Sequence, residues 1–264
     1  MRERRIVGQA RYGRRLVIAV VVAALVALGM GSSALATPGD EFVVFKQCPV
    51  HTYRVTGCFY APIGSGYLTL GKTVVPIAKT VVLQGGMLKE SEEEEGVRQL
   101  APALDGETLT KVGQTLPGGL FGGPLDAVTE LAAPASSILL SRGLDLSLIL
   151  PIKLRLVNPL LGPECSIGSN AHPIDLRLTT GTNADLTGNP GEETSIEEGK
   201  IAVLSGVSMV SSGFAVPKAS GCESAVVDEA VDAKLGLPSD ENTVATFNMK
   251  IETANSGAVE VSEG

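Results

Sequence analysis

The residues best suited to chemistry in this chain are its four cysteines, and the chemistry that they favour is disulfide formation. Cys48, Cys58, Cys165 and Cys222 are an even set, which is typical of a disulfide framework in a chain bound for an oxidising compartment. Three pairings are possible. We expect Cys48 to pair with Cys58, which closes a hairpin-sized loop, and Cys165 to pair with Cys222. Zinc ligation is disfavoured because the chain has no C-x-x-C spacing and only 2 histidines.

Nucleophilic catalysis has few candidates in the sequence. No G-x-S-x-G elbow is present, and a cysteine nucleophile would need a free thiol. The candidate histidine bases are His51, inside the loop between the first two cysteines, and His172, directly before Pro173. A surface or loop position is the commoner explanation of either histidine. We therefore expect a protein that is not an enzyme, with a hydrolase of unfamiliar site as an alternative.

Metal, cofactor and sugar sites are also poorly supported. A site for carbohydrate usually stacks the sugar ring on aromatic faces, and this chain has no Trp, 4 Tyr and 6 Phe. No cofactor motif stands out. Calcium is the most acceptable metal, because one loop concentrates oxygen ligands that do not follow the EF-hand pattern. These residues are Asn183, Asp185, Asn189, Glu192 and Glu193. A solvated acidic loop explains them equally well, and we expect no cofactor and no resident metal.

A binding site for an apolar ligand has more support. The stretch from Leu116 to Leu161 is rich in Leu and Gly for so acidic a chain, and small β folds can hold an apolar molecule between sheets. The simpler explanation is that these leucines fill the core. The sequence thus leaves a binding or structural protein as the first hypothesis and a carrier of an apolar ligand such as a lipid as the second, with the hydrolase of unfamiliar site as the third.

The first 36 residues have the pattern of a cleavable signal peptide. Six arginines and a single acid, Glu3, occupy the first fifteen positions, and the apolar run from Leu16 to Gly31 follows. Ala34 and Ala36 then supply the small side chains that signal peptidase accepts, so we expect cleavage after Ala36. An uncleaved anchor is the alternative. The predicted organisation is a signal peptide at 1–36 and a single β-rich extracytoplasmic domain at 37–264.

Cleavage would leave a strongly acidic protein. The signal takes six of the 21 basic residues and one of the 29 acidic residues, which leaves 15 against 28 and a net charge near −13. Nucleic acid and anionic lipid surfaces bind clustered Lys and Arg, so neither is an expected partner. We expect a secreted or envelope-associated protein without a stable transmembrane segment, whose partner is an unknown envelope component or an apolar ligand. Whether it is released or held at the surface stays open.

Alternating hydrophobic residues predict the strands that must position any site. Every second residue from Leu144 to Leu156 is Leu or Ile, which indicates a long strand with one dry face. Pro151 cannot donate to a ladder, so we expect an edge strand or a bend there. Further strands are predicted at 42–45, 55–60, 67–75, 80–83, 174–178, 201–204 and 245–251. The predicted fold is mostly β, an antiparallel β-sandwich or barrel-like domain stapled by disulfides.

Helix is predicted in two places only. Ser220 and Glu223 form a capping-box pattern, and Gly236 with Pro238 ends the run that follows, so we expect a short C-terminal helix with Cys222 in its first turn. A weaker helix is predicted over 125–132. Two segments are expected to be loops, at 89–95 and at 179–199.

Several short motifs together resemble a family of uncharacterised exported proteins from high-GC Gram-positive bacteria. They are FKQCP at 45–49, CSIGSN at 165–170, PI at 173–174, LTTG at 178–181 and KLGLP at 234–238. The resemblance covers most of the mature chain. It implies export, and it carries over no functional residue because the family has no assigned activity.

Overall fold

The computed structural model describes residues 40–89, 97–138 and 145–262, and the chain from Glu41 onward clusters as one unit. The predicted signal peptide lies outside the described residues, as do the four consecutive glutamates at 92–95. The unit is built mainly from strands, and the pairings between its long strands are antiparallel.

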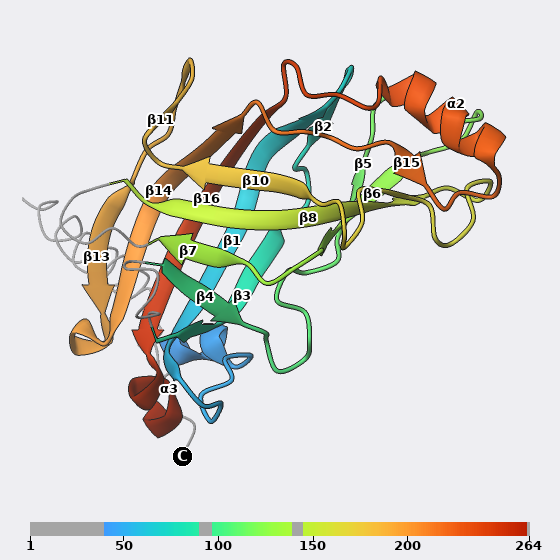
Figure 1. Ribbon diagram of the computed structural model, residues 1–264. Coiled ribbons are helices and arrows are strands. Elements are labelled where there is room, and N and C mark those ends of the chain that lie inside the picture. Colours follow the sequence, from blue (N-terminus) through green and yellow to red (C-terminus); the bar gives the residue numbers. More distant parts are fainter. Residues whose placement is uncertain (1–39, 90–96, 139–144, 263–264) are drawn as a thin grey trace, which may run out of the picture. The chain divides into compact units, whose positions relative to one another are not determined.

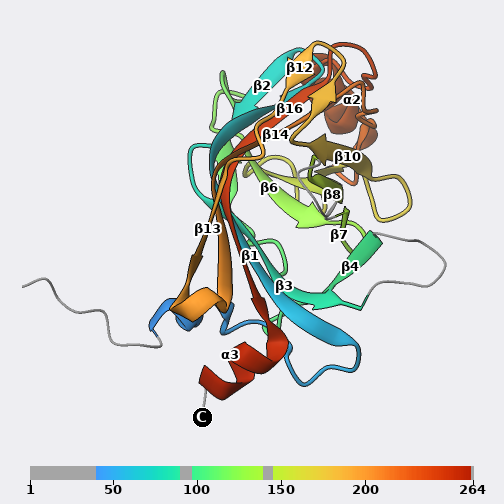
Figure 2. The same cartoon turned by 90° about the vertical axis from the view of Figure 1, so that its left-hand side faces the viewer.

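The strands form two layers that one sheet makes by curling back on itself. The first layer contains β14 (Ile201–Ser212), β16 (Val244–Asn255), β1 (Val55–Leu70) and β3 (Val81–Leu88), in that order. The second contains β10 (Ile174–Thr179), β8 (Ser147–Val157), β7 (Ser136–Ile138) and β6 (Asp126–Leu131), and β4 (Val97–Ala101) connects β3 to β7. Figure 1 shows β7, β8 and β10 crossing in front of β1, β14 and β16, and Figure 2 shows the two layers from the side.

The layers meet on a second side as well, because β10 pairs with β8 along its length and with β14 at Thr179 and Val210. The circuit of strands is thereby closed, which confirms the predicted antiparallel, barrel-like fold. The smaller elements are η1 (Asp40–Phe45), β2 (Thr73–Pro76), β5 (Gly113–Thr115), β9 (Ser166–Ile167), β11 (Thr182–Asn183), β12 (Leu186–Thr187), β13 (Glu192–Ile196), η2 (Glu197–Gly199), β15 (Ala219–Ser220), α2 (Ala225–Leu235) and α3 (Ser256–Ser262).

Strand β8 confirms the alternation on which the fold prediction depends. Its even-numbered residues from Leu148 to Leu156 are all at most 4% exposed, because they face the space between the layers. Strand β8 as a whole is not an edge strand, since it has partners on both sides, but among the described strands Pro151 itself is paired only with Asp175 of β10. The proline is tolerated because it lies where the partner on one side changes from β7 to β6.

Two predicted segments have the opposite secondary structure. The expected strand at 42–45 belongs to the 3₁₀ helix η1, in which Phe42 and Phe45 are both buried while Val43 is 62% exposed. A spacing of three places both rings on one side of a helix with three residues per turn. The weak helix expected over 125–132 is instead strand β6, which pairs with β8 from Asp126 to Leu131. Pairing with a long neighbour there overrides a weak local preference for helix.

The predicted C-terminal helix is confirmed as α2, but it begins later than expected. Its N-cap is Ser224, whose side chain accepts a hydrogen bond from the backbone N–H of Val227. Ser220 is paired with Ser166 in the β9–β15 ladder and does not cap the helix, so Cys222 precedes the first turn. Gly236 ends α2 in the left-handed conformation, as its position predicted. The loop expected at 179–199 contains the short strands β11, β12 and β13.

Both expected disulfides are present, Cys48 with Cys58 and Cys165 with Cys222. The first belongs to a small cluster of buried apolar residues that includes Phe45 of η1 and Val259 of α3, and the second lies just before α2. In Figure 1 α2 and α3 stand at opposite ends of the unit. The two bridges therefore fasten opposite ends of the same sheet.

Candidate functional site

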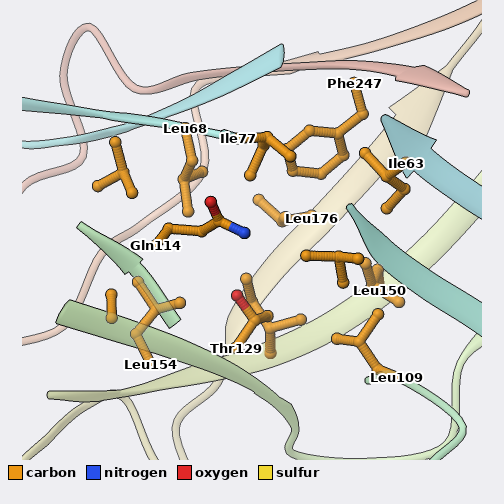
Figure 3. A pocket seen from close by; sticks show the side chains of 14 residues that line it. Ile63, Leu68, Ile77, Leu109, Gln114, Thr129, Leu150, Leu154, Leu176 and Phe247 are labelled. Atoms are coloured by element: carbon orange, nitrogen blue, oxygen red, sulfur yellow. The ribbon is translucent and has the colours of Figure 1, made fainter. Parts of the chain in front are cut away.

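The candidate site is a small cavity between the two layers. Fourteen side chains line it, and twelve of them are apolar. Strand β8 contributes Leu150, Ile152 and Leu154 from one layer, and Phe247 of β16 lies on the other. Figure 3 shows Leu150, Leu154 and Phe247 around the amide of Gln114. The alternation of β8 positions its leucines here, because every second side chain points toward the facing layer.

Gln114 is the first of two polar residues in the cavity. Its side-chain oxygen accepts hydrogen bonds from the backbone N–H groups of Ala78, at 2.9 Å, and Lys79, at 3.0 Å. Its Nε2 donates to the carbonyl oxygen of Lys79 at 2.7 Å. Only 2% of Gln114 is exposed. A single side chain on β5 thus binds the loop between β2 and β3 and at the same time forms part of the cavity wall.

Thr129 is the second polar residue, and it lies on β6 beside β5. Figure 3 shows its hydroxyl oxygen facing the same space as the Gln114 amide. Within the described ranges, the structure contains no hydrogen bond that uses this hydroxyl. The hydroxyl is therefore free to donate to, or accept from, a group inside the cavity.

The volume of the cavity limits what it holds. It measures about 30 Å³. A water molecule needs roughly 10–15 Å³ measured in this way, so the space suits about two waters. Sites for drug-sized ligands are roughly ten or more times larger. A lipid would fit only if the two layers moved apart.

Two open grooves on the surface each measure about 340 Å³. The first includes Glu130, whose carboxylate is 3.0 Å from Nε of Arg155 and 3.7 Å from Nζ of Lys153. The Glu130 carboxylate therefore forms ion pairs with both Arg155 and Lys153. The second groove includes Arg98 and Lys200, at the end of the sheet where β4 and β14 begin.

The two histidines weighed as catalytic bases lie away from the cavity. His51 has a side chain that is 78% exposed, and its Nδ1 is 3.5 Å from a carboxylate oxygen of Glu260 on α3. His172 is exposed in a turn, where its backbone N–H donates to the hydroxyl of Ser169. Neither histidine is among the cavity-lining residues or the residues of the two grooves.

The oxygen-bearing residues weighed as calcium ligands are dispersed over several short elements. Asn183 of β11 accepts a hydrogen bond from the hydroxyl of Ser212, and Asn189 accepts one from the backbone N–H of Gly191. Glu192 and Glu193 are exposed on β13. Within the described residues, no group of three or more acids, histidines or cysteines is placed to hold a metal ion.

Sequence reasoning missed Gln114 and Thr129 because neither belongs to a motif. Gln114 lies on a strand of three residues, in a region full of Gly and Pro, and β6 was expected to be a helix. The sequence neighbours of Gln114 are Gly113 and Thr115, so no local pattern marked it as part of a cavity wall. In the described part of the chain, no helix has the length and apolar character needed to cross a bilayer. Comparison of the chain with protein families, curated proteins and solved structures gave no match in any of the three.

Proposed function

We propose that this chain is a secreted or cell-envelope-associated protein that acts by binding and not by catalysis. The observation that carries the proposal is how its buried polar side chains are used. Thr108, Asn158 and Thr243 are each at most 7% exposed. Asn158 and Thr243 each donate a hydrogen bond to a backbone carbonyl of another segment. Thr108 accepts one from the backbone N–H of Ala103 within its own loop. Gln114 forms three hydrogen bonds with the backbone of another segment. Buried polar groups that hold loops in place make a rigid scaffold and leave few groups for reaction.

The proposed location is supported by the two disulfides and by the sequence. Disulfides persist in oxidising compartments, and small exported domains use them to stabilise limited cores. The signal-like segment at 1–36 and the resemblance to exported proteins point the same way. The disulfides, the signal-like segment and the resemblance support the proposed location whether or not the protein binds a partner.

A carrier of an apolar ligand is the second candidate, and the apolar lining of the cavity between the layers favours it. Its walls are apolar, and Gln114 and Thr129 place polar groups inside it. A whole lipid would require the layers to separate, because its volume exceeds the cavity many times. A small apolar molecule would need only modest side-chain movement.

The test begins with native protein purified from the producing organism. We expect no turnover of ester, peptide or glycoside substrates, and we expect the protein to bind a component of the envelope fraction. Turnover that is lost in His51→Ala or His172→Ala, and kept in the exposed control Val226→Ala, would contradict the proposal. Solvent extraction of the same sample reports the second candidate, which predicts a stoichiometric apolar compound.

A further inference from the structure

We propose that the interlayer cavity is a binding site for a small, mainly apolar molecule that carries one hydrogen-bond acceptor, such as a ketone or ester carbonyl. The inference rests on the second candidate function, a carrier of an apolar ligand, and narrows its ligand class. It depends on three features: a fixed amide N–H, a free hydroxyl, and walls that hold water poorly. Each feature belongs to described residues.

The amide of Gln114 has one N–H group to spare. An amide nitrogen carries two hydrogens, and one of them is used in the bond to the carbonyl of Lys79. The other has no acceptor among the residues that the structure describes. The amide cannot turn over, because its oxygen is held by the N–H groups of Ala78 and Lys79. Figure 3 shows the nitrogen facing the middle of the cavity.

A buried donor without an acceptor is costly, so the cavity favours an occupant that accepts a hydrogen bond. Water is one such occupant, but a buried water normally makes about three hydrogen bonds. Here the cavity offers only Gln114 and Thr129 among its fourteen lining residues. Two waters would therefore be poorly satisfied, and a molecule that displaces them loses little.

The apolar side chains that line the rest of the cavity determine the chemistry of the ligand apart from its acceptor group. A carbonyl oxygen placed at Nε2 of Gln114 leaves the alkyl parts against the side chains of Leu150, Leu154 and Phe247. The resting space of about two waters is smaller than a molecule of roughly four or five heavy atoms such as 2-butanone, so binding requires the side chains that line the cavity to move outward. A charged ligand is excluded because no ionisable side chain lines the cavity to pair with it.

The experiment is a methyl NMR titration of the full mature protein with 2-butanone and with 2-methyl-1-butene, which replaces the carbonyl oxygen by a CH₂ group. We expect both to shift the methyl signals of Leu150 and Leu154, and to leave those of the exposed Val226 unchanged. We express the preference for a carbonyl as the dissociation constant of the ketone divided by that of the alkene. In Gln114→Met this ratio should be about threefold to tenfold higher than in the wild-type protein, because one hydrogen bond to the ketone is lost. An unchanged ratio would overturn the acceptor requirement.

A cavity-filling variant tests the location. Ala127 is 1% exposed and lines the cavity, so Ala127→Leu should abolish binding of both probes. If that variant does not fold, Leu176→Ala provides the second test, because it enlarges the cavity. It should bind 2-pentanone about fourfold more tightly than 2-butanone, as expected for one more buried CH₂.

Binding that survives Ala127→Leu, no gain in Leu176→Ala, or no shift of the cavity methyls in the wild-type protein would overturn the proposal. Those outcomes leave the proposed binding of an envelope component intact, because that function does not require the cavity. Turnover of an ester by the same protein would refute the non-catalytic function and would leave the measured occupancy of the cavity unaffected. The failure of one proposal can therefore be told from the failure of the other.

Discussion

Replacing Gln114 by Leu tests whether this side chain holds the β2–β3 loop to β5. The variant loses three hydrogen bonds of 2.9, 3.0 and 2.7 Å. At about 1 kcal/mol of net stability each, their loss costs about 3 kcal/mol. Ala78 and Lys79 are exposed residues, so water replaces part of what is lost. Leu also gains from contact with the apolar walls, and we expect a net loss of about 2 kcal/mol in the free energy of unfolding.

The matched control is Gln84→Leu. Gln84 lies on β3, is half-buried, and makes one side-chain hydrogen bond to a described residue, to the carbonyl oxygen of Glu107 at 3.3 Å. The loss of this hydrogen bond should lower the free energy of unfolding by about 0.5 kcal/mol. Urea unfolding with both disulfides intact measures each change as a shift in midpoint at constant m-value. If Gln114→Leu costs no more than Gln84→Leu, the reasoning about the amide is wrong.

Three further predictions concern stability, and urea unfolding checks all of them. Replacing Cys165 and Cys222 by Ala removes a bridge between residues 57 apart in sequence and should lower the free energy of unfolding by about 4 kcal/mol. Replacing Cys48 and Cys58 by Ala removes a bridge between residues 10 apart and should lower it by about 3 kcal/mol. The reverse order would contradict the chain-entropy argument. Leu150→Ala should lower the free energy of unfolding by about 2–5 kcal/mol, because the side chain is 2% exposed. Val226→Ala, at a residue that is 74% exposed, should change it by about 0.5 kcal/mol or less. Equal effects would mean that β8 does not form the core. Gly71→Ala should destabilise the protein more than Gly106→Ala. Both glycines have positive φ, but only at Gly71 would the new methyl group meet the carbonyl groups of Leu235 and Gly236. Similar losses of stability would refute the close approach of this turn to α2.

Local patterns predicted the parts of the fold that one segment determines by itself. The alternation along β8 depends only on which face of a strand is buried, and the end of α2 depends only on the left-handed conformation that Gly236 adopts easily. The disulfide pairing was also predictable, because Cys48 and Cys58 are close in sequence and only one other pair remains.

Segments whose structure is decided by distant partners were predicted wrongly. β6 is a strand because it lies beside β8, and nothing within residues 125–132 reports that neighbour. Ser220 has the pattern of a helix cap, yet its pairing with Ser166 keeps it in a strand. The same limit applies to the cavity. Gln114 and Thr129 meet Phe247 only after more than a hundred residues of chain have folded back, so no spacing in the sequence brings them together.

The central claim is that this chain is exported and held by two disulfides as a rigid binding scaffold. Intact mass analysis of the protein recovered from culture medium and envelope fractions of the producing organism, alkylated with and without reductant, tests it most directly. We predict a chain that begins at Thr37, takes up no alkyl groups before reduction, and takes up four afterwards, one for each of its 4 cysteines. A soluble cytosolic chain that retains Met1 and is alkylated at every cysteine without reductant would contradict the claim.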